Sequence, residues 1–294
     1  MRNALAIVAT CALATVAHAQ DLQVVNARAL FPEGPAMSNG KLLYAEYAGN
    51  AVTVWDGKTN AQLWKQDGCG PSAIVPIGEN FGITCYDSGQ LVVISKDGKT
   101  LKSYGKDDAG GTLVGPNDGT PDGKGGAYFT LPGPWESGPI VGRVVHLTAD
   151  GKLIEAANDL HYPNGIARGT DGRLYVNESE AGRVISFQTE PSGSLSDRRV
   201  FIRLYQMGEA PDVYPDGIKL GPNGNFYVGE YREPGLVGDA GNVLEITPDG
   251  KIKNKSAAWP NMTFSDDGKT MYVMAVDHMG GAPYEGKVYA VTLK

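Results

Sequence analysis

Six segments of the chain place a polar or acidic residue directly after a proline. The prolines are 39, 45, 47, 52 and 45 residues apart. The residues that follow them are Glu33, Ser72, Asn117, Asn164, Asp216 and Asn261. Five of the six carry a carboxylate or carboxamide oxygen, which can bind a cation such as Ca²⁺, and a carboxylate can also transfer a proton. The alternative is that Asn and Asp before Gly only form tight turns, although Glu33 is not a typical turn residue.

The two most similar segments read YPNGIARGTDGRLYVNE at residues 162–178 and YPDGIKLGPNGNFYVGE at residues 214–230. Each of the six segments is followed by a glycine and an apolar alternation, as in GRVVHLTADGK after the Asn117 segment and GNVLEITPDGK after the Asp216 segment. Such alternation between Asp-Gly or Asn-Gly turns predicts short antiparallel strands. A repeat of about 40–50 residues is the length of a four-stranded blade. We therefore predict an all-β fold, a six-bladed β-propeller; a β-sandwich, the alternative, would not need this regular spacing.

The ring is predicted to close by pairing of the N- and C-terminal strands, residues 22–29 with residues 287–293. The first strand of each blade lines the central channel, and each proline segment begins such a strand, so the six polar residues should surround one channel mouth. Two carboxylates that meet there repel each other unless a cation or proton lies between them. Oxygen ligands without Cys or paired His favour Ca²⁺, Mg²⁺ or Mn²⁺ over Zn²⁺.

The N-terminus has the features of a signal peptide. A basic start is followed by an apolar stretch from Ala4 to Ala17 and by AHA before Gln20, which fits a signal-peptidase site. We expect a signal peptide at residues 1–19 and one propeller domain at residues 20–294, in the periplasm or secreted. The apolar stretch is too short for a stable membrane span, so no membrane association is expected after cleavage.

Composition limits the partners that the protein could have. With 26 basic and 33 acidic residues, the chain lacks the basic balance that nucleic-acid binding requires. We expect a monomer that acts on a small-molecule substrate. Cys69 and Cys85 could pair in an oxidising compartment, but as flanks of a simple hairpin they would not lie opposite each other, which argues against a disulfide.

At these segments the chain resembles the family of six-bladed propellers that contains senescence marker protein, gluconolactonase and luciferin-regenerating enzyme. The resemblance covers nearly all of the mature chain and rests on EGP at 33–35, ND at 117–118 and PNGI and PDGI in the two best copies. It implies one divalent cation, most often calcium, with Mg²⁺, Mn²⁺ or Zn²⁺ as alternatives. The resemblance assigns the metal ligands to Glu33, Asn164 and Asp216.

The resemblance also implies hydrolysis of a lactone, with Asp216 as the catalytic carboxylate and Asn117 binding either metal or substrate. In this reaction the metal would polarise the carbonyl, and Asp216 would take a proton from water. The loop at 131–142 should contribute Trp135 and Glu136 to substrate binding. Sugar lactonases of this family commonly carry an Arg two residues before Asn117; here that position is Gly115, which argues against an aldonolactone substrate.

Three other functions compete with lactone hydrolysis. A phosphotriesterase or aryl esterase would use the same site. A quinone-dependent dehydrogenase would need a large cleft rich in basic and histidine residues, and the chain has only four histidines, of which His146 and His161 are interpreted as structural. A non-catalytic exported binding module would keep a structural metal and bind a partner through its loops.

Overall fold

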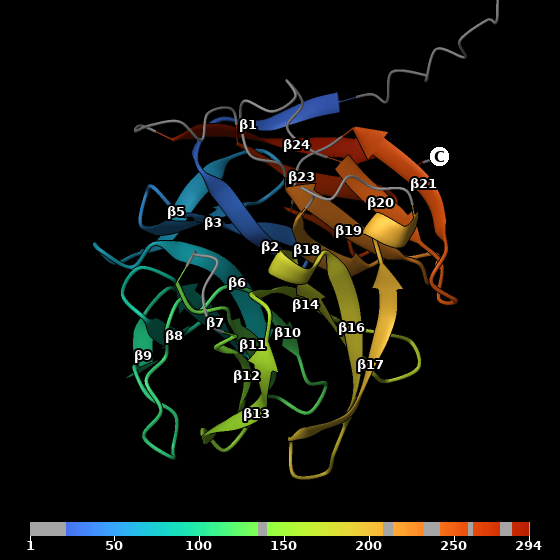
Figure 1. Cartoon of the computed structure of the whole chain (residues 1–294). Helices are drawn as coiled ribbons and strands as arrows, with labels where there is room; N and C mark the ends of the chain where they lie inside the picture. The colour runs from blue at the N-terminus through green and yellow to red at the C-terminus, as the bar shows by residue number, and fades with distance from the viewer. Residues whose placement is uncertain are drawn as a thin grey trace, which may run out of the picture.

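Six four-stranded antiparallel sheets lie in a ring around a central axis in the computed structural model (Figure 1). The structure describes residues 22–134, 140–207, 214–231, 242–257, 261–276 and 284–293. Within these residues there is no α-helix; the only helical elements are two short 3₁₀ turns, Ser179–Ala181 and Tyr205–Met207. The prediction of an all-β, six-bladed propeller is confirmed.

Each of the first five blades is a meander of four consecutive strands, ordered from the axis outward. The first blade contains β2 (Pro32–Ser38), β3 (Lys41–Glu46), β4 (Ala51–Trp55) and β5 (Asn60–Lys65). The second contains β6 (Pro71–Ile77), β7 (Asn80–Cys85), β8 (Gln90–Ile94) and β9 (Thr100–Tyr104). The third contains β10 (Gly119–Pro121), β11 (Ala127–Leu131), β12 (Gly142–Leu147) and β13 (Leu153–Leu160).

The fourth and fifth blades continue this pattern, and the sixth is completed by the N-terminus. The fourth contains β14 (Pro163–Arg168), β15 (Leu174–Glu178), β16 (Arg183–Thr189) and β17 (Leu195–Arg203). The fifth contains β18 (Tyr214–Leu220), β19 (Phe226–Tyr231), β20 (Asn242–Ile246) and β21 (Ile252–Ala257). The sixth contains β22 (Asn261–Phe264), β23 (Thr270–Val276), β24 (Glu285–Thr292) and, outermost, β1 (Leu22–Leu30).

The ring closes through β1, as the sequence predicts. This strand pairs antiparallel with β24 from Leu22, opposite Val291, to Leu30, opposite Glu285. Figure 1 shows the two strands side by side at the edge of the molecule. The last blade therefore contains strands from both ends of the chain.

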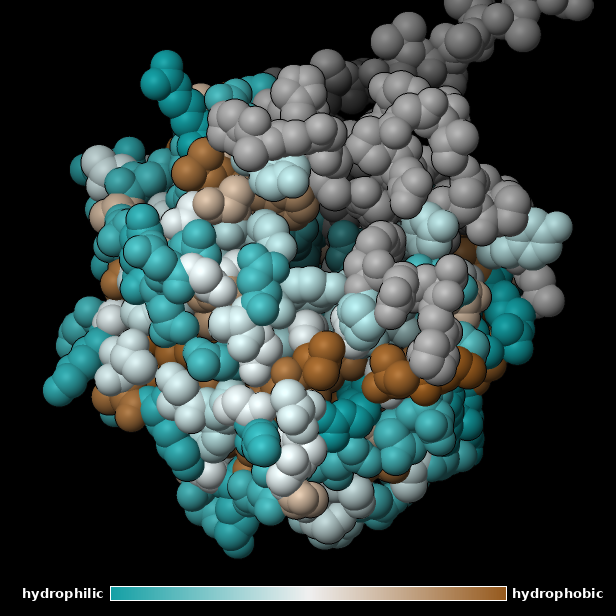
Figure 2. All heavy atoms as spheres, turned by 60° about the vertical axis from the view of Figure 1, so that its left-hand side comes forward, coloured by the Kyte–Doolittle hydropathy of each residue, from teal (hydrophilic) through white to brown (hydrophobic). Residues whose placement is uncertain are grey.

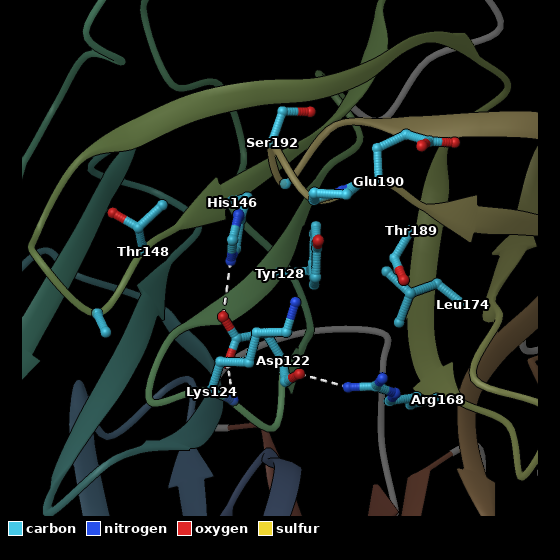
Figure 3. Close-up of a pocket in the computed structure, with 13 residues that line it drawn as sticks. Asp122, Lys124, Tyr128, His146, Thr148, Arg168, Leu174, Thr189, Glu190 and Ser192 are labelled. Carbon is cyan, nitrogen blue, oxygen red and sulfur yellow. Dashed lines mark hydrogen bonds and ion pairs between the residues drawn. The ribbon is translucent and has the colours of Figure 1, made fainter.

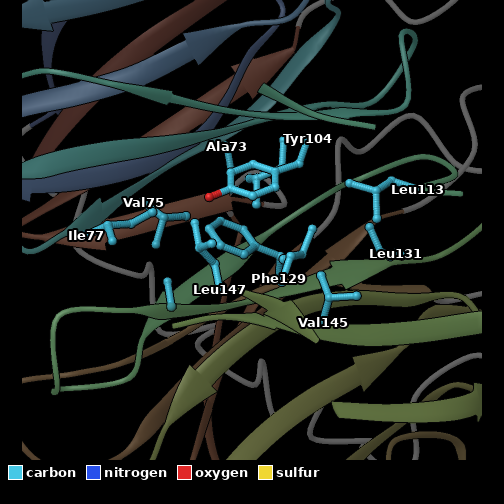
Figure 4. Close-up of a cluster of buried hydrophobic side chains, with 12 residues drawn as sticks. Ala73, Val75, Ile77, Tyr104, Leu113, Phe129, Leu131, Val145 and Leu147 are labelled. Atoms are coloured by element: carbon cyan, nitrogen blue, oxygen red, sulfur yellow. The ribbon is translucent and has the colours of Figure 1, made fainter. Parts of the chain in front are cut away.

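Hydrophobic side chains fill the space between neighbouring blades. In the cluster of Figure 4, Val75 and Ile77 of the second blade pack with Phe129 and Leu147 of the third. Phe129 has no solvent-exposed surface. A strand buried on both faces needs apolar residues at successive positions. All five residues of β11 are buried, and all but Thr130 are apolar or aromatic.

The motif glycines allow the inner strands to approach each other closely. A Cβ atom on Gly165 would lie 2.3 Å from the carbonyl oxygen of Asp216 in the next blade. A Cβ on Gly34 would lie 2.2 Å from the carbonyl oxygen of Ser72, and Gly34 has a positive φ of 38°. Both distances are too short for a side chain, so glycine is required where the blades converge.

The expectation that Cys69 and Cys85 are unpaired is wrong, because the structure joins them in a disulfide. Cys85 lies opposite Pro71 at the end of β7, and the register shifts between Pro71 and Ala73. Gly70, with φ of 55°, turns the chain just before β6. This turn brings the Cα of Cys69 to 4.6 Å from that of Cys85, which a simple hairpin would not do.

Within the described part of the chain, no helix is long and apolar enough to cross a membrane. The predicted signal peptide lies outside the described residues, as do Trp135 and Glu136.

Loss of the disulfide should destabilise the protein. A bond that closes a loop of about 15 residues typically stabilises the folded state by about 3 kcal/mol, mainly by restricting the unfolded chain. We expect the double variant Cys69→Ala/Cys85→Ala to lose about 2–4 kcal/mol in urea denaturation. A reducing agent should destabilise the wild type but not this variant; equal sensitivity of both proteins would contradict the assignment.

Candidate functional site

The predicted site residues lie at the starts of the inner strands. Glu33 and Asn164 are each the second residue of their strand, β2 and β14; Asp216 is the third residue of β18, and Asn261 is the first residue of β22. Asn117 lies two residues before β10. Because every inner strand begins at the same face of the ring, these side chains meet at one mouth of the channel. In Figure 2 this side of the molecule is hollowed, with hydrophilic side chains inside.

The central feature of the site is a pair of carboxyl groups, Glu33 and Asp216, that come from the first and fifth blades. Both residues are partly buried. Burial raises the pKa of Asp216 well above its ordinary value, and the nearby charge of Glu33 raises it further. Burial likewise raises the pKa of Glu33. Removing carboxylates from water and placing them together disfavours their ionised forms, so the pair tends to hold protons unless a cation is present.

Two buried carboxamides contact the carboxyl pair. Asn261 donates from Nδ2 to Oε2 of Glu33 at 2.9 Å, and the backbone N–H of Gly34 donates to the same oxygen at 3.3 Å. The side chain of Asn164 lies within hydrogen-bonding reach of Asp216 and lowers its pKa. An amide orients a carboxylate without neutralising its charge, so the repulsion between the two carboxylates persists.

Asp118 and Lys219 also belong to this site, and the sequence reasoning missed both. Lys219 Nζ lies 3.4 Å from Oδ2 of Asp118, whose side chain is almost fully buried. The charge of Asp118 raises the pKa of both Glu33 and Asp216. Asp118 directly follows Asn117, so a search of the residues beside each motif position would have found it. Lys219 has no comparable local signal.

Side chains of one blade hold the motif backbone of the next. Asn177 donates from Nδ2 to the carbonyl of Asp216 at 2.6 Å. Ser72 and Thr84 donate to the carbonyl of Asn117 at 2.9 and 2.6 Å. Ser72, one of the six ring residues, therefore positions its neighbour's backbone and does not contribute an oxygen to the channel. These contacts fix where Asn117 and Asp216 lie.

The donor set fits a hard divalent cation. Within the described residues, no group of three or more His, Cys, Asp or Glu side chains is arranged to hold a metal, so an ion at this mouth would need carboxamide ligands as well. Two carboxylates with adjacent Asn side chains provide oxygen ligands only, which suit Ca²⁺, Mg²⁺ or Mn²⁺. A bound cation would also relieve the repulsion between Glu33 and Asp216.

The sequence model of the SMP-30/gluconolactonase/LRE-like region matches residues 31–277 of the chain. The chain belongs to this family. The match spans all six inner strands and includes Glu33, Asn117, Asn164, Asp216 and Asn261. No functionally curated protein matches the chain.

Solved structures with similar folds include proteins of known name. A gluconolactonase from Xanthomonas campestris is 23% identical, with a TM-score of 0.71, over 93% of this chain and 89% of that one. A luciferin-regenerating enzyme is 19% identical, with a TM-score of 0.69, over 93% and 95% of the chains. The calcium-binding protein regucalcin from Agrobacterium tumefaciens is 16% identical, with a TM-score of 0.68, over 91% and 92%. At these identities the likeness shows the shared fold.

The carboxyl pair predicts how stability depends on pH without metal. The pKa of Glu33 is raised from 4.5 to about 7 in the folded protein, so between these values the folded state binds more protons than the unfolded state. Stability of chelator-treated protein should therefore fall as pH rises from 5 to 8. We expect the melting temperature to drop by several degrees over this range.

Excess calcium should reverse this dependence of stability on pH, because the metal binds the ionised carboxyl pair of the folded protein. At a free calcium concentration of 100 times Kd, this binding stabilises the folded state by about 2.7 kcal/mol. Glu33→Gln removes one charge and serves as the matched control. This variant should show a shallower pH dependence and little stabilisation by calcium. A wild-type melting temperature that rises with pH in chelator would contradict this interpretation of the pair.

Proposed function

We propose that this protein is a metal-dependent hydrolase that opens small lactones. The observation that carries the proposal is the pair of mutually repelling carboxyls, Glu33 and Asp216, at a channel mouth with adjacent carboxamides. A protein keeps such an unfavourable arrangement where it serves a function. Membership of the family supports the reaction class, as does the likeness to a gluconolactonase.

Glu33, Asn164 and Asp216 would hold the cation, most often calcium in this family, and Asn117 would bind either the cation or the substrate. When bound, a divalent cation supplies Lewis acidity that polarises the lactone carbonyl. The ligand residues come from three different blades, so their relative positions depend on the whole ring. The contacts of Asn177 with the backbone of Asp216 hold one of them in place.

Asp216 acts as the general base in this mechanism. Its carboxylate takes a proton from water while the water oxygen bonds to the carbonyl carbon. The bond from that carbon to the ring oxygen then breaks, and the proton passes from Asp216 to the ring oxygen, which gives a hydroxy acid. Asn164 orients the carboxylate, and the raised pKa of Asp216 makes it a stronger base toward the attacking water.

Asp216→Asn should abolish most lactone hydrolysis while the fold is kept. Loss of a general base typically lowers the rate by about 10²–10⁴, and the loss should appear mainly in kcat. Asn164→Asp is the matched comparison, because it keeps a base and changes the charge at the metal. Activity would be followed as acid release from five- and six-membered lactones, with bound metal measured for each variant.

If metal-loaded Asp216→Asn hydrolyses lactones as fast as the wild type, Asp216 is only a ligand and the assignment is wrong. Aryl esters and an aryl phosphotriester belong in the same panel. If the protein hydrolysed either of these substrates faster than the lactones, the proposed activity would be that of an aryl esterase or a phosphotriesterase instead. A wild type that turns over none of them would favour the binding module.

The mouth beside Asn117 favours a substrate with an apolar substituent. Gly115 has no room for a side chain, because its Cβ would lie 2.8 Å from the carbonyl oxygen of Gly133 and 3.0 Å from the ring of Tyr86. An arginine that binds sugar hydroxyls therefore cannot occupy this position without local rearrangement. Val114 and Val141, which lie near the same end of the blade, are about half exposed, at 48% and 49%.

We therefore expect a higher kcat/KM for alkyl-substituted γ- and δ-lactones than for gluconolactone, by at least about tenfold. The reason is that burial of two or three methylenes contributes about 1–3 kcal/mol to binding. The same panel of assays tests this preference. Val114→Ser/Val141→Ser should reduce the difference by raising KM for the alkyl lactones alone. Preferential hydrolysis of gluconolactone would contradict the inferred substrate class.

A further inference from the structure

A second cavity lies on the opposite face of the ring, between the third and fourth blades (Figure 3). It has a volume of about 190 Å³. Asp122 follows the end of β10, and Arg168 is the last residue of β14. These two inner strands begin at the channel mouth, so the cavity and the carboxyl site lie at opposite ends of the same strands.

One wall of the cavity is a rigid aromatic stack. The rings of Tyr128 and His146 are parallel within 13°, with centroids 4.2 Å apart. His146 Nε2 lies 2.8 Å from Oδ2 of Asp122. The loop before β17 closes over the imidazole at Gly193, where a Cβ atom would lie 2.2 Å from Nδ1. His146 Nδ1 is buried and has no hydrogen-bond partner. The imidazole ring therefore forms part of the cavity wall, and the loop at Gly193 covers its Nδ1 edge.

The carboxylate of Asp122 already makes three hydrogen bonds. Oδ1 accepts from the backbone N–H groups of Lys124 and Gly126 at 2.6 and 2.9 Å, and Oδ2 faces His146. Burial opposes ionisation of Asp122, but these contacts outweigh it and hold its pKa below the ordinary value. A ligand in the cavity would therefore find at most one free acceptor position on this carboxylate.

The cavity instead offers unused donors. The guanidinium of Arg168 donates from Nη1 to the carbonyl of Asp122, which leaves its other N–H groups available. Among the described residues, the only ion pair between residues that line the cavity is that of His146 with Asp122. Lys124 is thus a second cation without a carboxylate partner, and Figure 3 shows both at the lower side of the cavity. Glu190 accepts a short hydrogen bond from Ser196.

We propose that this cavity binds a small organic carboxylate with a flat apolar body. The carboxylate would pair with Arg168, whose planar guanidinium matches it in a two-point contact, with Lys124 adding charge. The apolar body would lie against the edge of Tyr128, which also lines the cavity. An apolar cavity of about 150 Å³ binds benzene, so a cavity of about 190 Å³ has room for a ligand of the size of benzoate.

Benzoate is the probe, titrated by calorimetry into the full-length calcium-loaded protein, with benzyl alcohol and inorganic phosphate as comparisons. The site should bind benzoate at least about tenfold more tightly than either, because charge-assisted hydrogen bonds and the apolar body both contribute. Arg168→Gln should weaken binding at least about tenfold, and Lys124→Gln, in an exposed turn, about two- to fivefold. Arg199→Gln, whose side chain is 67% exposed on β17, is the matched control and should change nothing.

The location is tested with the same proteins. Benzoate should shift the amide resonances of Thr189 and Gly193, which line the cavity. Binding that survives Arg168→Gln but is lost in Asp216→Asn would place benzoate at the channel mouth and overturn the proposal. Absence of binding at 10 mM (about 2.7 kcal/mol), or equal affinity for phosphate, would also overturn it. If Arg168→Gln unfolds, the Lys124→Gln result decides.

Discussion

Six strands that must converge on one axis impose the constraint on which the rest of this structure depends. Near the axis the backbones are so close that Gly165 has no room for a Cβ beside Asp216, and Gly34 has none beside Ser72. Each blade can therefore direct only a few side chains into the channel. Glu33 and Asn164 illustrate this limit. Each is the polar residue that its inner strand directs into the channel, and each lies directly before a glycine.

The convergence also places charges where water cannot screen them well. The charge of Glu33 raises the pKa of Asp216, and the charge of Asp118 raises the pKa of both. Lys219 pairs with Asp118 and so offsets only part of the negative charge. The folded protein thus contains an unfavourable electrostatic arrangement that the hydrophobic packing between blades must outweigh. A site of this kind gains stability from the cation or proton that occupies it.

The fold could be predicted because its determinants are local. Alternation of apolar residues and Asp-Gly or Asn-Gly turns identify strands from neighbouring residues alone, and the spacing of the prolines then sets the number of blades. The position of β1 could be predicted because the last repeat contains only three of the four strands of a blade. The residues after the prolines could be placed at one mouth for the same reason, although their metal and substrate roles stay predictions.

Features that depend on contacts between distant residues could not be predicted. Asp118 and Lys219 are 101 residues apart and meet only because the third and fifth blades, with the fourth between them, converge on the same channel. The direction of Ser72, which points to the backbone of Asn117, is not visible from its place in the motif. The disulfide depends on a turn at Gly70, and the second cavity depends on the loop that covers His146.

The pairing of β1 with β24 has a consequence for how the protein folds. Leu22 pairs with Val291, so the sixth blade is complete only when two segments far apart in the sequence meet. Until then, β1 and the incomplete sixth blade both present open edges that can pair with other chains. Contacts between residues so far apart in sequence also form slowly. The folding chain is therefore most exposed to aggregation just before the ring closes, and chaperones that shield β1 would help it most.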